Sequence, residues 1–375
     1  MWEPQGYYSK FMLKQPTILF GKDAIQGLHN LPCAKCAVIY GKGFKTCHQD
    51  LLTSVLKGKT IAFFKKKWEG EPTLENISEN LREIEEFRPD IFIAVGGGSV
   101  LDGSKIIRLL YEFPYFDLDK KNFKYLEFKS LFIAIPTTIG SGAEVSSAAV
   151  LYNQTRQKKE MIVTHSFIPS IVILMPEIVQ SNSTDMNIKS SIDAISHIIE
   201  GYVSCIDNDI TNILAEKALE IFRLELSKEE DCWDYERLQY AGYIGGITQN
   251  HCLVGVTHAI AHQLTAFGFS HSEAIALLLP HIIDYNINNN FCIEKYAALS
   301  LASGFQDTAN LHHFIEKLCK RVISPETFEK SKVMFESLIN NKQFIENTIS
   351  DPGGKGNTPP ITEQYIINLM KGFSL

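Results

Sequence analysis

The change from alternating strands and helices to helices alone, near the middle of this chain, restricts its fold more than any other feature of the sequence. Short apolar runs are expected to form strands at residues 37–40, 60–64, 91–95, 131–135 and 171–174. Between the second and third of these, residues 73–87 carry apolar side chains at the three- and four-residue spacing of a helix. Continuously apolar strands that alternate with helices predict a parallel sheet covered on both faces. The first half is therefore expected to be a doubly wound α/β domain.

The second half of the chain has a different pattern. Helices are expected at residues 190–203, 211–226, 235–249 and 257–265 and, after a loop-rich stretch at 351–360, at 362–371. A chain of 375 residues is also long for a single hydrophobic core. We therefore expect an α/β domain at residues 1–177 and an all-α domain at residues 178–375.

Composition narrows the classes of protein to which the chain can belong. A net charge of -7 argues against a nucleic-acid partner, because binding to phosphates requires basic surface. No apolar run approaches the roughly 18 residues that suggest a membrane span, and the first residues lack the pattern of a secretory signal. The eight cysteines are scattered, so we expect reduced thiols in a cytoplasmic enzyme. Cys33 and Cys36 form a lone C-x-x-C pair and are interpreted as structural thiols.

A glycine-rich turn directly follows the strand expected at 91–95. The turn consists of Gly96, Gly97, Gly98 and Ser99. Glycines allow the backbone to approach a phosphate closely, and the free N–H groups at the start of the next helix attract an anion. The turn therefore indicates a phosphate site, although a tight turn alone is the alternative and the spacing is not G-x-G-x-x-G. Asp102 and Lys105 extend the pattern into the helix, and Asp102 is a candidate for both cofactor binding and catalysis.

A second polar loop follows the strand expected at 131–135. It has the sequence PTTIGSGAE at residues 136–144, and its hydroxyl-bearing candidates are Thr137, Thr138 and Ser141. Ligands of open parallel sheets bind at the carboxyl ends of the strands. Threonine and serine hydroxyls can hold phosphate, ribose or nicotinamide without adding charge. The alternative interpretation is a hydroxyl-rich helix cap.

A third pattern, in the helical half, is typical of a metal site. Asp193 and His197 are four residues apart in SSIDAISHIIEGY and therefore lie on one helix face. His258 and His262 repeat this spacing in GVTHAIAHQL, and His271 follows after a short loop. A carboxylate with several imidazoles suits Zn²⁺, Fe²⁺ or Ni²⁺.

These motifs, in this order along essentially the whole chain, resemble the iron-containing (group III) alcohol dehydrogenase family. The resemblance implies a dinucleotide-binding α/β domain, a helical metal-binding domain, and an active site in the cleft between them. It implies metal ligation by Asp193, His197, His258 and His271. His262 is then a catalytic candidate beside the metal or near the nicotinamide. Lys159 joins the turn and loop residues named above as a candidate cofactor contact.

The implied activity is hydride transfer between a nicotinamide dinucleotide and a small alcohol or aldehyde, with a metal that polarises the substrate oxygen. Iron is the usual metal of the family and zinc is the alternative; a homodimer is expected. Three departures from the family pattern indicate a divergent subgroup: Ser272, the Gly140–Glu144 run, and Met175 before Pro176. Rival interpretations are a dehydroquinate-synthase-like or glycerol-dehydrogenase-like enzyme and a non-catalytic relative. The sequence does not identify the alcohol or aldehyde.

The turn after the strand expected at residues 37–40 is relevant to the choice between NAD(H) and NADP(H). Enzymes that select NAD place an acidic side chain near the ribose 2′-hydroxyl, where it repels a 2′-phosphate. Here Gly41 and Lys42 follow the strand, and no acidic residue occurs before Asp50. We therefore expect Gly41 to leave room for the phosphate, Lys42 to pair with it, and NADP(H) to be preferred. In the alternative interpretation the glycine only shapes a turn.

Overall fold

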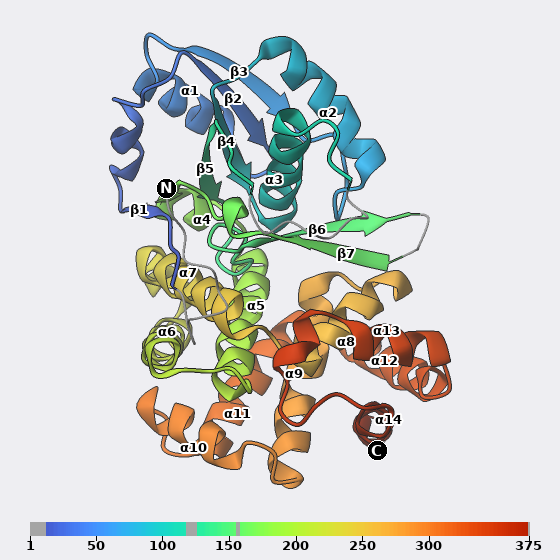
Figure 1. Cartoon of the computed structure of the whole chain (residues 1–375). Helices are drawn as coiled ribbons and strands as arrows, with labels where there is room; N and C mark the ends of the chain where they lie inside the picture. The colour runs from blue at the N-terminus through green and yellow to red at the C-terminus, as the bar shows by residue number, and fades with distance from the viewer. Residues whose placement is uncertain (1–12, 118–125, 155–157, 374–375) are drawn as a thin grey trace.

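The first domain is built on one parallel sheet of six strands. A computed structural model describes residues 13–117, 126–154 and 158–373. The strands lie in the order β1-β8-β5-β4-β2-β3, and every neighbouring pair is parallel. Their bounds are β1 Thr17–Phe20, β2 Lys35–Tyr40, β3 Thr60–Lys65, β4 Ile91–Gly96, β5 Leu131–Pro136 and β8 Ile171–Leu174. The prediction of a parallel α/β sheet is confirmed (Figure 1).

Helices cover both faces of this sheet because successive side chains of each strand point to opposite faces. Ile39 of β2 packs in the core with helices α2 (Leu74–Phe87) and α3 (Gly98–Glu112). Its neighbour Val38 belongs to a second core, which contains Leu52 of helix α1 (Thr46–Val55). This alternation makes the sheet doubly wound. The carboxyl ends of β4 and β5 lie at the edge of the sheet nearest the second domain (Figure 1).

Two features of the first domain were not predicted. Strand β1 is only four residues long and lies at the edge of the sheet, where its apolar side chains Ile18 and Phe20 are exposed. Strands β6 (Ala148–Asn153) and β7 (Lys158–Val163) form an antiparallel hairpin outside the parallel sheet. The hairpin packs beside α3 and extends toward helices α8 and α13 in Figure 1.

The second domain is entirely helical in its described residues, as predicted. The helices are α4 Pro176–Gln180, α5 Thr184–Val203, α6 Asp209–Leu226, α7 Tyr235–Cys252, α8 Val256–Leu264, α9 His271–Asn288, α10 Ile293–Ala302, α11 Thr308–Val322, α12 Pro325–Leu338, α13 Lys342–Ser350 and α14 Glu363–Phe373. Helix α5 is buried along most of its length and packs against α6, α7 and α9. Strand β8 ends two residues before α4 begins, while the division at residue 177 stays a prediction.

Candidate active site

The two polar loops at the carboxyl edge of the sheet lie against each other. Strands β4 and β5 are hydrogen-bonded neighbours, and Gly96 is directly opposite Pro136, so both loops leave the sheet at the same level. A Cβ atom placed on Gly98 would be only 2.9 Å from the Cβ atom of Ser141. Gly97 lies similarly beside the Thr138 side chain. The contact requires residues without a side chain in the first loop, which explains the glycine cluster.

The second loop also contacts the helix that carries the first two metal-ligand candidates. A Cβ atom on Gly140 would come within 1.7 Å of the carbonyl oxygen of Ser190 on α5, so only glycine fits there. Ser190 is less than one helical turn before Asp193. The loop of the first domain and the acidic residue of the second are therefore held together by a close backbone contact.

Four side chains that were predicted as metal ligands converge in the second domain. Asp193 Oδ1 lies 3.4 Å from His271 Nε2, 3.6 Å from His258 Nε2 and 3.8 Å from His197 Nε2. Asp193, His258 and His271 each offer a ligand atom within 4.8 Å of the other two. His197 lies outside this compact group of three, although its ring stacks on that of His258 at a centroid distance of 4.7 Å.

Two of the converging atoms of this cluster lack hydrogen bonds, which fits a bound cation. Asp193 Oδ1 and His258 Nε2, which lie 3.6 Å apart, are both buried and have no partner. Nδ1 of His197 and Nδ1 of His271 are also buried without a partner, but in both rings it is Nε2 that lies nearest to Asp193. A buried polar atom without a partner costs about 1–3 kcal/mol, so two that face each other are a reason to expect a ligand. One carboxylate and three imidazoles suit a divalent transition metal.

The electrostatics of the cluster also favour a cation. Burial lowers the pKa of His197 to about 3, so this ring is neutral and able to ligate. Burial also disfavours a charge on His258, but the carboxylates of Asp193 and Glu200 outweigh it and raise the pKa of His258 to about 9. Without a metal, a proton on His258 therefore provides the positive charge between the carboxylates of Asp193 and Glu200. A bound cation would provide that charge in its place.

The structure adds two carboxylates that the sequence analysis did not identify. Glu200 Oε2 lies 2.5 Å from His258 Nδ1, and Glu200 is buried. It is seven residues after Asp193 and three after His197, so it shares their helix face, and this spacing was available in the sequence. Asp351 Oδ2 lies 2.9 Å from His262 Nδ1. Asp351 is in the loop-rich stretch before the last helix, and no local signal connects it with His262.

The remaining predicted cofactor residues have specific partners. Lys42 forms an ion pair with Glu69 at 3.1 Å. A Cβ atom on Gly41 would lie 2.8 Å from Val100 Cγ2, so this glycine has a packing role as well as the predicted role in admitting a phosphate. The cofactor assignments of Gly41 and Lys42 remain predictions.

Three further candidates lie close to the loops. Lys159 is paired with Glu71 at 2.8 Å. Burial lowers the pKa of His271, Asp193 opposes this lowering, and the charge of Lys159 adds a smaller lowering effect. Asp102 accepts a hydrogen bond from the backbone N–H of Val150 at 3.1 Å and lies 3.4 Å from the ammonium of Lys105. These contacts connect α3 with the hairpin. A catalytic role of Asp102 stays a prediction.

Thr137 is buried beside Gly43.

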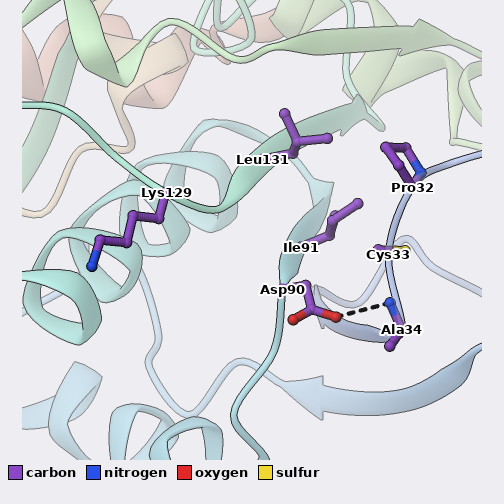
Figure 2. A pocket seen from close by; sticks show the side chains of 7 residues that line it. All are labelled: Pro32, Cys33, Ala34, Asp90, Ile91, Lys129 and Leu131. Atoms are coloured by element: carbon purple, nitrogen blue, oxygen red, sulfur yellow. Dashed lines mark hydrogen bonds between the residues drawn. The ribbon is translucent and has the colours of Figure 1, made fainter.

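The opposite edge of the sheet holds a hollow without obvious chemistry. Figure 2 shows Cys33, Asp90 and Lys129 among its lining residues, at the amino ends of the strands. The Asp90 carboxylate accepts hydrogen bonds from the backbone N–H groups of Ala34 and Lys35, both at 2.8 Å. All eight cysteines of the chain are free thiols, and Cys33 Sγ lies 3.4 Å from Cys36 Sγ. The structural role predicted for this pair agrees with burial, which raises the pKa of Cys36 to about 12.

Comparison with known proteins identifies one family along both domains. Residues 15–176 match the family described as iron-containing alcohol dehydrogenase, and residues 187–373 match the C-terminal part of the Fe-containing alcohol dehydrogenase family. The NADPH-dependent butanol dehydrogenase of Clostridium saccharobutylicum is 28% identical over 353 residues, which cover 89% of this chain and 90% of that protein. The 1-propanol dehydrogenase of Citrobacter freundii is 30% identical over 258 residues, 66% of this chain and 67% of that one.

The solved structures show the same fold. The iron-containing alcohol dehydrogenase of Thermococcus thioreducens superposes with a TM-score of 0.83 at 24% identity, covering 97% of this chain and 99% of that one. In the part of the chain that the structure describes, no helix is both long and apolar enough to cross a bilayer.

Proposed function

This chain belongs to the iron-containing alcohol dehydrogenase family, and we propose that it reduces a small aldehyde with NADP(H), using one divalent metal ion. At the coarser level the chain is an oxidoreductase of alcohols and aldehydes that uses a nicotinamide dinucleotide. The observation that supports the proposal most directly is the convergence of Asp193, His258 and His271, with His197 beside them and with unpartnered donor atoms. Such a site suits a bound cation and has no other evident use in the fold.

We assign the metal to Asp193, His197, His258 and His271. When bound, a divalent cation supplies Lewis-acid chemistry: it polarises the substrate oxygen and lowers the pKa of the alcohol. Glu200 accepts a hydrogen bond from Nδ1 of His258 and thereby presents Nε2 toward the other ligands. Iron is proposed as the ion and zinc as the alternative, since both suit these ligands.

The dinucleotide is assigned to the edge of the sheet where β4 and β5 end. The N–H groups of Gly98 and Ser99, at the start of α3, are not used by any backbone hydrogen bond in the described residues, and we assign them to the pyrophosphate. Thr138 and Ser141 lie directly beside these glycines and extend the site toward α5. The contact of Gly140 with α5 then positions the reactive end of the cofactor near the histidine cluster.

His262 is proposed to hold or transfer a proton near the substrate oxygen. The carboxylate of Asp351 can only accept a hydrogen bond, so Nδ1 of His262 carries the hydrogen and Nε2 is free to accept or donate a proton. Its ring stacks on that of His271 at a centroid distance of 5.5 Å. Asp351 is therefore a positioning residue for His262.

The preference for NADP(H) is supported by the absence of an acidic residue directly after β2. Because cells keep NADPH reduced, aldehyde reduction is the proposed direction. A cytoplasmic homodimer is part of the proposal. The names of the relatives, which act on butanol and propanol, support a short-chain substrate.

The test combines metal analysis with a hydride-transfer assay. The purified protein is expected to hold close to one divalent ion per chain, and to oxidise NADPH faster than NADH with short-chain aldehydes. A matched protein with Asp193→Ala should contain little metal and show no activity. A metal-free wild type that is fully active would contradict the proposal, and so would a lack of hydride transfer with every aldehyde and alcohol of the panel.

A further inference from the structure

We propose that Lys66 binds the adenosine 2′-phosphate of NADP(H) and sets the preference for this cofactor over NAD(H). The inference rests on the proposed dinucleotide site and adds a residue that the sequence analysis did not assign to it. It also transfers the role of phosphate-binding cation from Lys42 to Lys66.

The position of Lys66 follows from the pairing of the outer strands. Tyr40, the last residue of β2, is opposite Lys65, the last residue of β3. The backbone N–H of Lys66 then donates to the carbonyl of Tyr40 at 2.9 Å, which places Lys66 directly beside Gly41. In doubly wound folds, the residue that reads the ribose 2′ position follows the strand adjacent to the phosphate turn, here β2. Lys66 therefore borders that position from the neighbouring strand.

The side chain of Lys66 is directed toward the phosphate turn by its contacts. Its ammonium lies 3.4 Å from Ser99 Oγ and 5.6 Å from the centroid of the Trp68 ring. Trp68 is itself buried, and its Nε1–H donates to Ser99 Oγ at 3.0 Å. The indole packs directly on α3, because a Cβ atom on Gly103 would be 2.3 Å from Trp68 Cζ2. A lysine ordered in this way loses less entropy on binding a phosphate than a free one.

The hydroxyl of Ser99 has a role in this arrangement that differs from the predicted contact with the cofactor. Ser99 Oγ donates to the carbonyl of Gly70 and accepts from Trp68, so it holds the loop after β3 over the turn. We therefore assign the side chain of Ser99 to positioning Lys66, and only its backbone N–H to the pyrophosphate. With the pyrophosphate assigned to the backbone N–H groups, the ammonium of Lys66 is available to bind the second anionic group of the cofactor, the 2′-phosphate.

The charges around the two lysines distinguish them. Lys42 has Glu69 as an ion-pair partner at 3.1 Å, and its side chain is 75% exposed. Lys66 is half-buried, and no carboxylate of the described residues lies within 4.0 Å of its ammonium. Burial lowers the pKa of Lys66; the charge of Glu69 opposes this lowering, and the smaller effects of Lys42 and Glu71 act in opposite directions. A partly buried ammonium without a carboxylate in direct contact gains more from a dianionic phosphate than one that is already paired.

The test compares cofactor ratios and direct binding in the wild type and four variants. Lys66→Gln should lower the ratio of kcat/KM for NADPH to that for NADH by about 10- to 100-fold, the effect expected for one charged hydrogen bond. Lys66→Arg should retain most of the preference. Lys67→Gln is the matched control, because Lys67 is paired with Glu83 and Glu79 on the surface and should keep the wild-type ratio.

Calorimetric titration with adenosine 2′,5′-bisphosphate and with 5′-AMP provides a readout that does not need catalysis. Lys66→Gln should weaken binding of the bisphosphate by a similar factor and leave that of 5′-AMP within about twofold. Equal losses for both nucleotides would place Lys66 at the pyrophosphate and overturn the inference, and so would loss of preference in Lys42→Gln alone. If Lys66→Gln does not fold, failure of Lys66→Arg to bind the bisphosphate better than 5′-AMP decides against it.

Failure of the proposed function would look different. A wild type that transfers hydride equally well from NADH and from NADPH, or that binds both nucleotides equally, overturns the role of Lys66 and the preference for NADP(H) but leaves the proposed hydride transfer intact. A wild type that binds the bisphosphate more tightly than 5′-AMP but transfers no hydride overturns the catalytic proposal and leaves the role of Lys66 intact.

Discussion

Nδ1 of His258 lies 2.5 Å from Oε2 of Glu200, and both side chains are buried in the second domain. A second oxygen of the same carboxylate accepts from the backbone N–H of Thr257 at 2.7 Å. Glu200 therefore fixes both the ring of His258 and the start of the helix that carries it. The proposed metal site thus depends on a residue that does not itself bind the metal.

We expect Glu200→Gln to weaken metal binding by about 10- to 100-fold, as is typical when a partner of a ligating histidine is changed. The amide keeps the shape of the side chain but loses the negative charge that favours ligation. The measurement is competition with a chelator of known affinity, followed by metal analysis. Glu216→Gln, which only alters a contact with the hydroxyl of Tyr202, serves as the control. Wild-type affinity in Glu200→Gln would contradict this prediction.

Alanine at His262 and alanine at His271 should have different effects. His271→Ala removes a member of the compact metal-binding group, so metal content should fall together with activity. His262→Ala should keep its metal and lower kcat by about 100-fold or more, because only the proposed proton carrier is lost. Metal content and initial rates of both variants provide the measurement. Loss of metal from His262→Ala would make His262 a ligand instead.

Gly140→Ala should disturb the junction between the domains. The new methyl group would lie 1.7 Å from the carbonyl oxygen of Ser190, so the loop or helix α5 must move. We expect a loss of about 1–3 kcal/mol in the free energy of unfolding, together with weaker binding of both metal and dinucleotide. Thermal unfolding and nucleotide titration test this. Ser141→Ala, in the same loop, should change stability by less than about 0.5 kcal/mol; equal effects of the two would contradict the explanation.

Glu144, in the second polar loop, makes stability depend on pH. Burial raises the pKa of Glu144 to about 7, above the value of 4.5 that is normal for glutamate. The folded protein therefore holds a proton that the unfolded chain releases, and stability is lost as the pH rises from about 4.5 to 7. We expect Glu144→Gln to raise Tm relative to wild type at pH 8, with the difference shrinking toward pH 5. A difference that does not change with pH would show that Glu144 is ionised in the folded state.

Periodicity in the sequence predicted most of the fold. The apolar strands β2, β4 and β5 are buried on both faces of the sheet, so their pattern is continuous and readable. The sequence analysis missed strand β1 and the hairpin of β6 and β7. These strands are not buried on both faces, so which of their side chains are buried depends on the elements that pack against them. Tertiary context outweighs local preference most strongly at edges.

The sequence by itself determined which residues share a helix face, because a spacing of four residues brings side chains together on any helix. This rule places Asp193 beside His197 and His258 beside His262. It could also have placed Glu200 on the same helix face as Asp193 and His197. Only the tertiary structure decided that Asp351 forms a hydrogen bond with His262 and that Glu69 forms an ion pair with Lys42. It also decided that the side chain of Lys66 lies over Trp68, next to the phosphate turn. The first two contacts join residues that are far apart in the sequence, and the third depends on the packing of Trp68 against α3. Their formation therefore depends on how the chain packs, which no local pattern encodes.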